Sequence, residues 1–418
     1  MKALIDKIRV WGFAGILNFV KAKYGNAVQR RRLTVLARRS QVKEPERGVT
    51  VIGELTGRVS LSKALRDFVL NMKDAGIPCQ AYDTLLKPQI PQADIEGIVT
   101  PLEKFDIGRY SHIVMMYRSP LDEKLVPNLS CARIAFHESE HGIHETAPYL
   151  RESGDAIIAM SDFNFNYYKR AFPNQPVYKI VFPFRFKRKD ATPRTEMRVK
   201  YGMGIDDFVV FFNFDFGSYY RKNISAALKA FALAFKGDET AKLLFKTKGA
   251  SANKRQVAEM ERLVAELGIE RQFIHISQYL PRADVDGLTE ACDVYLSLHK
   301  AEGFGMGMAE AMSQGKPVIA TNWSANTEFC REDTAWCIPY RMVPVLPHEY
   351  MVATKEWAEA DVESAAAALR EIRSNPELVA ERTAKGKLFM EKHFSIVNFK
   401  KSVDAFLDGR LGICQEEF

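Results

Sequence analysis

Short apolar runs alternate with longer amphipathic stretches along most of this 418-residue chain. The run GVTVIGEL at 48–55 is typical of a buried strand, and the amphipathic stretch at 61–75 after it predicts a helix. Further strands are predicted at 77–81, 112–116, 132–136, 156–160 and 177–181. Short apolar strands that alternate with helices form a parallel sheet covered on both faces. The pattern therefore predicts one α/β domain over 45–185.

A second series with the same alternation follows a segment at 183–194 that is rich in Pro, Lys and Arg and is interpreted as a linker. Its strands are predicted at 208–212, 242–246, 273–276, 294–298, 318–321 and 336–338. Its helices are predicted at 224–235, 254–267, 306–314, 359–373, 376–392 and 396–408. This makes 186–394 a second α/β domain. In doubly wound sheets ligands bind outside the carboxyl ends of the strands, so we expect the site in the cleft between the two domains.

The composition is that of a soluble globular protein, with 47% hydrophobic and 27% charged residues. The six cysteines are scattered without a CxxC pair, which argues against a disulfide framework or a zinc site. The longest apolar stretch, at 10–20, is interrupted by Asn18 and is too short to span a bilayer. No signal peptide is evident, so the sequence predicts a cytoplasmic protein.

The N-terminal arm, residues 1–44, is strongly basic. Residues 1–43 contain eleven Lys and Arg and a single acid, Asp6, so this segment carries +10 while the whole chain carries +7 and the remainder −3. Apolar residues between the basic clusters, among them Trp11, Phe13 and Phe19, are typical of helices that lie in a membrane interface. An anionic membrane surface is therefore one predicted partner, and a helix packed on its own domain is an equal alternative. No nucleic-acid-binding fold accompanies the arm, which disfavours nucleic acid.

The segment AEGFGMGMAEAMSQGKPVIATNWSANTE at 301–328 is the most informative part of the chain. Glu302 lies in a glycine-rich turn, and Glu310 lies about two turns along the helix that follows. Gly303 and Gly305 allow backbone N–H groups to approach a ligand closely, and the helix that opens near Gly305 directs its free N–H groups to the same place. Such a turn suits a pyrophosphate, with carboxylates on either side to accept hydrogen bonds from sugar and ribose hydroxyls. The alternative is a buried turn with two solvated glutamates.

A second cluster, FNFDFGSYYRKN at 212–223, places Arg221 and Lys222 where a strand end leads into a helix. Cations at a helix N-terminus oppose the helix dipole, so a bound anion explains them better than solvation alone. Lys246 and Lys248, at the end of the next strand, are weaker candidates.

Two other patterns resemble metal sites. The segment HESEH at 137–141 spells HExxH, but that motif needs a helix and this copy follows a predicted strand, so a polar loop or a ligand-facing loop is favoured over zinc. The segment DVD at 284–286 spells DxD, but it follows Pro281 at the start of a predicted helix, where acids suit the dipole. The sequence therefore predicts no metal.

The block at 301–328 resembles the donor-site signature of retaining glycosyltransferases with the α/β GT-B fold, in which two Rossmann-like domains face each other across a cleft. The chain is most similar to bacterial mannosyl- or rhamnosyltransferase-like enzymes that build surface polysaccharides. The resemblance is strong over 207–340 and weaker over 50–185. It implies that residues 395–418 form a helix that crosses back to the first domain. It also implies a nucleotide diphosphate sugar as substrate, no cofactor, and a saccharide or polyprenyl-diphosphate-linked saccharide as acceptor.

The resemblance also implies a role for each matching residue. Glu302 would bind sugar hydroxyls and Glu310 the ribose, while Lys222 and Arg221 would neutralise the diphosphate. The backbone of Gly303, Phe304 and Gly305 would contact the donor, and the backbones of Tyr279 and Leu280 would line its base. His137 would face the donor sugar from the opposite domain. Glu140 and Gly57 would lie on the acceptor side.

The chain departs from the family pattern at two places. The family arginine lies a few residues before the lysine, and Asp215 stands near that position here. The turn after the first strand offers only Gly53 and Gly57, without the adjacent glycines of the family. An epimerase or phosphorylase on the same fold, and a scaffold that binds a sugar nucleotide without transfer, remain the alternative functions.

Overall fold

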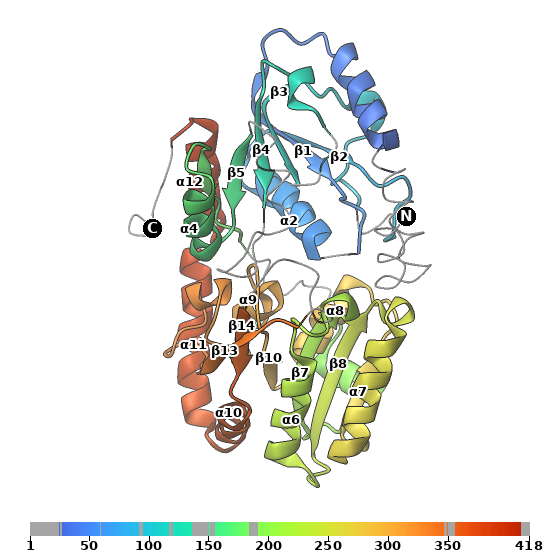
Figure 1. The fold of residues 1–418 in the computed structure, drawn as a ribbon, viewed down its shortest axis with the longest axis vertical. Helices are drawn as coiled ribbons and strands as arrows, with labels where there is room; N and C mark the ends of the chain where they lie inside the picture. The colour runs from blue at the N-terminus through green and yellow to red at the C-terminus, as the bar shows by residue number, and fades with distance from the viewer. Residues whose placement is uncertain are drawn as a thin grey trace.

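Two parallel six-stranded sheets organise the protein in a computed structural model that describes residues 25, 27–58, 60–91, 95–116, 119, 121–135, 150, 155–183, 191–346, 349 and 356–410. Figure 1 shows two lobes, one above the other, with one sheet in each. The predicted pair of α/β domains with parallel sheets is confirmed.

The first sheet has the order β2-β1-β3-β4-β5-β6. Its strands are β1 (Glu46–Gly53), β2 (Cys79–Asp83), β3 (Tyr110–Met116), β4 (Ser130–Ile134), β5 (Ala156–Ala159) and β6 (Val177–Lys179). The helical segments among them are α2 (Ser60–Asp74), η2 (Leu102–Lys104), η3 (Glu123–Leu125) and α4 (Asp162–Ala171), and a helix at 27–39 precedes β1. The last six residues of β1 are all buried, as expected for a central strand of a parallel sheet.

The second sheet has the order β12-β11-β10-β7-β8-β9. Its strands are β7 (Phe208–Asp215), β8 (Ala241–Lys248), β9 (Phe273–Ile276), β10 (Val294–Ser297), β11 (Val318–Thr321) and β12 (Trp336–Ile338). The α-helices in the C-terminal half of the chain are α5 (Arg194–Lys200), α6 (Ile224–Phe235), α7 (Lys254–Leu267), α8 (Arg282–Ala291), α9 (Met306–Ser313), α10 (Val362–Ser374), α11 (Pro376–His393) and α12 (Ile396–Leu407). Short 3-10 turns are η4 (Phe216–Ser218), η5 (Ala250–Ala252) and η6 (Ala325–Glu328).

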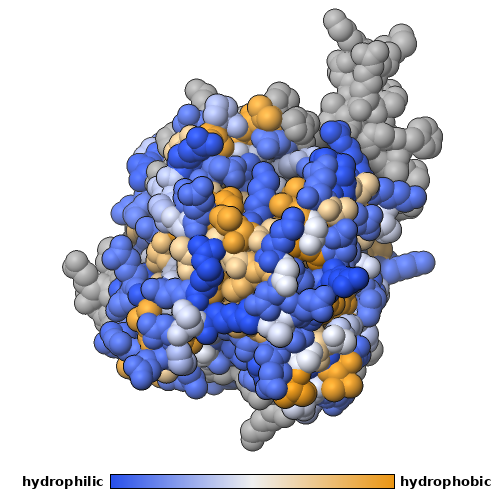
Figure 2. Space-filling view, turned by 90° about the horizontal axis from the view of Figure 1, so that it is seen from below, coloured by the Kyte–Doolittle hydropathy of each residue, from blue (hydrophilic) through white to orange (hydrophobic). Residues whose placement is uncertain are grey.

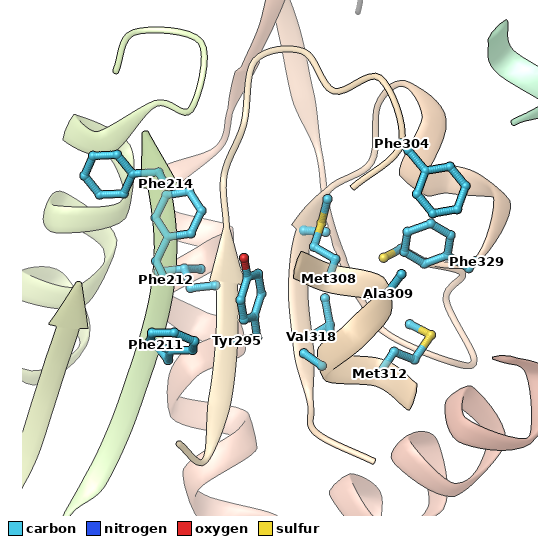
Figure 3. Close-up of a cluster of buried hydrophobic side chains, with 14 of the residues drawn as sticks. Phe211, Phe212, Phe214, Tyr295, Phe304, Met308, Ala309, Met312, Val318 and Phe329 are labelled. Atoms are coloured by element: carbon cyan, nitrogen blue, oxygen red, sulfur yellow. The ribbon is translucent and has the colours of Figure 1, made fainter. Parts of the chain in front are cut away.

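The centre of the second sheet is packed with aromatic rings. Phe211 and Phe212 on β7 both pack against Tyr295 on β10, with ring centroids 5.7 and 6.3 Å away. Figure 3 shows these rings on one side of α9, from which Met308 and Met312 project. Each of these side chains is at most 3% exposed, so a close-packed core fixes the strands and the helix that carry the glycine-rich turn.

The last helix returns to the first lobe. In Figure 1 α12 lies in the upper lobe beside α4, at the end of the long helix α11. Phe399 on α12 packs edge-on against Phe68 on α2 at 5.6 Å, and the backbone N–H of Val181 donates to Ser402 Oγ at 3.2 Å.

Residues 340–360 differ from the prediction. They contain an antiparallel hairpin of β13 (Tyr340–Pro344) and β14 (Glu356–Ala360), which the sequence analysis did not anticipate. The helix expected to begin at 359 begins at Val362, because the Asp361 side chain accepts a hydrogen bond from the Ser364 N–H at 2.7 Å and caps it there.

In the view of Figure 2, hydrophilic residues surround and separate the hydrophobic ones. Among the described residues, no helix is both long and apolar enough to cross a bilayer.

The strand orders locate the point at which ligands bind to such sheets. The order reverses between β1 and β3 in the first sheet and between β7 and β10 in the second. Loops that leave the carboxyl ends of strands on either side of a reversal diverge and leave a crevice. We therefore expect a ligand site at the segments after β1, β7 and β10.

Candidate active site

The turns after β7 and β10 bring two oppositely charged side chains together. Lys222 lies in the turn between β7 and α6, and Glu302 lies in the turn between β10 and α9. Lys222 Nζ donates to Glu302 Oε2, although the two residues are 80 positions apart in the chain. The sequence predicts Lys222 in a turn between a strand and a helix and Glu302 in a glycine-rich turn, and their contact follows from the neighbouring positions of β7 and β10.

Glu302 is held in its charged form by two cations. Burial by itself raises the pKa of a carboxyl group, but Lys222 and Arg221, 3.7 Å from Glu302 Oε2, outweigh it and lower the pKa of Glu302 to about 2. Arg221 is itself buried, with its NH1 group donating to the Ala301 carbonyl at 2.9 Å. Two cations and one carboxylate leave a net positive charge, which suits an anionic ligand.

The glycine-rich turn ends at the N-terminus of α9. Gly305 precedes the helix in a left-handed conformation (φ 97°, ψ 41°), which glycine adopts without the steric cost that other residues incur. Gly307, in the first turn of α9, lies so close to the Tyr295 ring that an added Cβ would be 2.2 Å from its hydroxyl. The first N–H groups of α9 thus face the same edge of the sheet as Lys222.

Glu310 makes contacts with both domains. Its Oε1 lies 2.7 Å from Nζ of Lys63, on α2 of the first domain, and 3.3 Å from NH1 of Arg282, on α8 of the second. Burial raises the pKa of Glu310, but Arg282 and Lys63 outweigh burial and lower it to about 2. Glu310 is therefore a charged group at the boundary of the two domains, on the same helix that opens beside Glu302.

Tyr279 and Leu280 lie in the loop after β9. Tyr279 is 40% exposed, whereas Leu280 is buried in the core. The guanidinium of Arg58, from the loop after β1, lies 4.7 Å from the centre of the Tyr279 ring. This cation–π contact brings the loop after β1 against the second domain.

The remaining donor-side and acceptor-side candidates come from both domains, and two of them lie outside the described residues. Gly57 lies in the loop after β1, and its carbonyl accepts from Arg66 NH1 at 2.8 Å. The carbonyl of Gly303 accepts from Asn164 Nδ2, at the start of α4, at 2.6 Å, so the first domain contacts the glycine-rich turn directly. Phe304 is buried against Phe329. His137 and Glu140 lie outside the described residues.

Other polar residues singled out in the sequence have protein partners. Asp215, near the position of the family arginine, accepts from the Gly217 N–H at 2.9 Å and lies 3.4 Å from Lys248 Nζ. Burial lowers the pKa of Lys246 to about 8, with a further contribution from Lys248. Asp284 and Asp286 of the DxD segment lie in the first half of α8, paired with Lys200 at 2.8 Å and with Arg282 at 2.6 Å. Over the part of the chain that the structure describes, no group of three or more His, Cys, Asp and Glu residues could hold a metal ion.

Residues 197–342 match the family model of glycosyl transferases, group 1. The match covers the second sheet from α5 into β13 and includes Lys222, Glu302 and Glu310. No curated protein sequence gives a significant match to the chain.

Solved structures are similar to the chain over nearly its whole length. A glycosyltransferase from Rickettsia africae superposes with a TM-score of 0.67 at 14% identity, covering 89% of this chain and all of that one. Anabaena HepE in complex with UDP-glucose gives 0.62 at 14% identity, covering 87% and 99%. WaaG, a glycosyltransferase involved in lipopolysaccharide biosynthesis, gives 0.60 at 15% identity, covering 86% and 100%. Together with the two parallel sheets, these matches confirm the predicted GT-B fold.

Several residues near Glu302 and Glu310 were missed by the sequence analysis. His299 and Lys300 come two and three residues after the end of β10, at the same sheet edge as Glu302, so their position after a predicted strand was an available signal. Lys63, Arg282 and Ser324 gave no such signal. Their relevance depends on contacts with Glu310 and Glu302 that join distant segments.

Proposed function

We propose that the protein is a retaining glycosyltransferase that moves a hexose from a nucleotide diphosphate sugar to a saccharide acceptor. The observation that carries this proposal is the cluster of Lys222, Arg221 and Glu302 beside the N-terminus of α9, at the strand reversal between β7 and β10. The family match over the same segment supports it. GDP-mannose and dTDP-rhamnose are the proposed donors, from the resemblance of the sequence to mannosyl- and rhamnosyltransferases.

In the proposed reaction the bond between the anomeric carbon and the diphosphate oxygen breaks, and its electron pair remains on the diphosphate. Lys222, Arg221 and the first N–H groups of α9 would stabilise this developing negative charge, which is the kind of preorganised electrostatic effect that lowers barriers most. The acceptor hydroxyl would attack the oxocarbenium-like centre from the same face, with retention, and its proton would pass to the departing diphosphate oxygen. No covalent nucleophile and no metal ion is part of this mechanism.

The carboxylates and the opposite domain would position the donor. Glu302 would accept hydrogen bonds from sugar hydroxyls, and Glu310 from the ribose. Lys63 would have to share or release Glu310 when a ribose binds, because both use the same carboxylate. Tyr279 and Leu280 would line the base, and His137 would face the sugar from the first domain.

The acceptor is proposed to be a lipid-linked saccharide at the inner face of a membrane. WaaG, a neighbour in fold, is involved in lipopolysaccharide biosynthesis, and the net charge of +10 on residues 1–43 suits an anionic surface. Flotation with anionic vesicles, with and without residues 1–43, tests the membrane part. If the full chain does not float, a soluble acceptor replaces this proposal.

The transfer reaction itself is tested with a panel of GDP-, dTDP- and UDP-sugars and a mixture of saccharide acceptors. We expect Lys222→Ala to lower kcat by roughly 10²–10³-fold, the usual loss when one donor to a developing anion is removed. Lys229→Ala is the matched control, since Lys229 is exposed on α6, the helix that follows this turn. EDTA should leave the rate unchanged.

Three outcomes would contradict the proposal. A fully active Lys222→Ala variant would remove the leaving-group assignment. A product formed from the donor alone, without acceptor, would indicate an epimerase. Binding of a nucleotide sugar without any turnover would indicate a scaffold.

A further inference from the structure

One carboxylate connects the two turns that form the candidate site. Glu359, on β14, accepts from Asn223 Nδ2 through Oε1 at 3.0 Å and lies 2.7 Å from Lys300 Nζ through Oε2. Asn223 is the residue after Lys222, and Lys300 lies two positions before Glu302. Glu359 therefore connects the segment that carries the cation to the segment that carries the carboxylate.

Backbone hydrogen bonds reinforce the same connection. The Lys300 N–H donates to the Arg221 carbonyl at 2.8 Å, and the Ala358 N–H donates to the Lys300 carbonyl at 3.0 Å. The hairpin of β13 and β14, the turn after β10 and the turn after β7 thus lie side by side in that order. Residue 359 lies beyond the segment at 197–342 that matches the family model.

The Lys300 ammonium makes its closest contacts with residues of β14. Its side chain is only 11% exposed, and Nζ lies 4.8 Å above the centre of the Trp357 ring. Besides Glu359 it has Glu349 at 3.7 Å. A largely buried ammonium that loses its closest carboxylate has to move or recruit another partner. The nearby turn at Glu302 would be disturbed by either change.

Two backbone positions in a conformation that favours glycine lie at the same place. Among the described residues, Asn223 (φ 54°) and Ser324 (φ 72°) are the non-glycine residues with positive φ. Asn223 is bonded to Glu359, and Ser324 Oγ accepts from the Glu302 N–H at 3.0 Å. Strained residues persist only where surrounding contacts hold them, and they are commonly found at functional sites.

We propose that Glu359 is a positioning residue, which fixes Lys222 relative to Glu302 by holding Asn223 and Lys300 at once. It touches neither the donor nor the acceptor, and its effect on the reaction passes through Lys222. The inference rests on the proposed function, because it assigns the hairpin a part in that same site.

A double-mutant cycle distinguishes positioning from general support of the fold. Glu359→Gln keeps the size of the side chain and removes the charge that holds Lys300. We expect kcat to fall roughly 10-fold with the donor KM changed less than about twofold, since small misplacements of a reacting group cost about one to two powers of ten. In the Lys222→Ala background the same substitution should have almost no further effect, because residues that act as a unit are not additive.

A second variant covers the case in which Glu359→Gln folds poorly. Asn223→Gly removes the bond to Glu359 and relieves the positive φ, so it should fold and still lower kcat. Arg341→Ala is the matched control, because Arg341 is an exposed residue paired with Glu359 in the register of the hairpin, and it should leave kcat unchanged. Melting temperatures are measured for every variant.

The outcomes separate the two proposals. A wild-type protein that transfers no sugar in the donor panel refutes the proposed function, and this inference falls with it. An active wild type with full activity in Glu359→Gln and Asn223→Gly overturns the positioning role alone. So does an equal loss from Glu359→Gln with and without Lys222, which would indicate general structural support.

Discussion

His299 shows how burial controls charge beside the candidate site. Its Nε2 lies 2.9 Å from Asn326 Oδ1 and its Nδ1 lies 3.1 Å from Ser297 Oγ, and the ring is fully buried. Burial lowers the pKa of His299 to about 4, and the Lys222 cation acts in the same direction, while Glu302 opposes them. The imidazole is therefore neutral at neutral pH and adds no positive charge to the Lys222 and Arg221 pair.

This shift predicts a loss of stability in mild acid. The unfolded chain binds a proton at His299 near pH 6.5, but the folded protein does so only near pH 4, so the free energy of unfolding falls as the pH is lowered through this window. Between about pH 7.5 and about pH 5 the free energy of unfolding of the wild-type protein should fall, and we expect His299→Gln to make this fall smaller by roughly 2 kcal/mol. Urea unfolding of both proteins at the two pH values measures it. An identical pH dependence in both would show that His299 does not titrate in this way.

At the scale of elements, α9 is fixed by close approach to the neighbouring strands. Tyr295 on β10 donates through its hydroxyl to Asn213 Oδ1 on β7 at 2.8 Å, directly beneath Gly307. A glycine at this position lets α9 lie against the tyrosine ring. The glycine-rich turn and the end of β7 therefore share one packing contact.

Gly307→Ala tests this contact. Alanine favours a helix by up to about 1 kcal/mol over glycine, but the added methyl group would lie 2.2 Å from the Tyr295 hydroxyl and 3.1 Å from Asn213 Oδ1. Because a buried ring cannot move freely, we expect net destabilisation of about 1–3 kcal/mol. Gly25→Ala, at a helical position with nothing within 4 Å of the new methyl group, should not destabilise. Chemical denaturation compares the two, and equal stability would contradict the close packing.

At the scale of the whole molecule, ion pairs and hydrogen bonds join the two domains at the site. Lys179 on β6 lies 2.7 Å from Glu328 on η6, and the Asp162 N–H donates to the same carboxylate at 2.9 Å. Lys63 and Glu310 form a second bridge. The side chains of Lys179 and Glu328 are only 6% and 4% exposed, so water solvates neither charge well and each is stabilised by the other.

Lys179→Met is expected to destabilise the contact between the two domains. The variant removes the Lys179 cation from the buried Glu328 carboxylate, and removal of one partner of a buried ion pair costs about 3–5 kcal/mol. The control is Arg271→Ala, at the exposed pair with Glu239, which should leave the unfolding midpoint unchanged. Calorimetry of both variants should show a lower and broader transition for Lys179→Met only. If the unfolding transition of Lys179→Met matches that of the wild type, the Lys179–Glu328 pair does not stabilise the contact between the domains.

The elements of both sheets were predicted from the sequence within a few residues, because each is encoded by a local apolar pattern. The helices Ile224–Phe235 and Lys254–Leu267 and the strands Phe273–Ile276 and Val318–Thr321 have the predicted bounds. The hairpin at 340–360 was not predicted, because EWAEA lacks a clear strand pattern and lies in a two-stranded sheet apart from the two parallel ones. The roles of the site residues, including His137 and Glu140, stay predictions.

The sequence by itself determined the two α/β domains and placed Lys222, Glu302 and Glu310 in turns or on a helix at strand ends, since periodicity and glycine turns are local properties. Only the tertiary structure decided which charges meet. Lys222 reaches Glu302 across 80 positions, Lys63 reaches Glu310 from the other domain, and Glu359 reaches Asn223 from a hairpin. Such pairs depend on strand order and domain packing, which no local pattern encodes, and the first two of them help to lower the pKa values of Glu302 and Glu310.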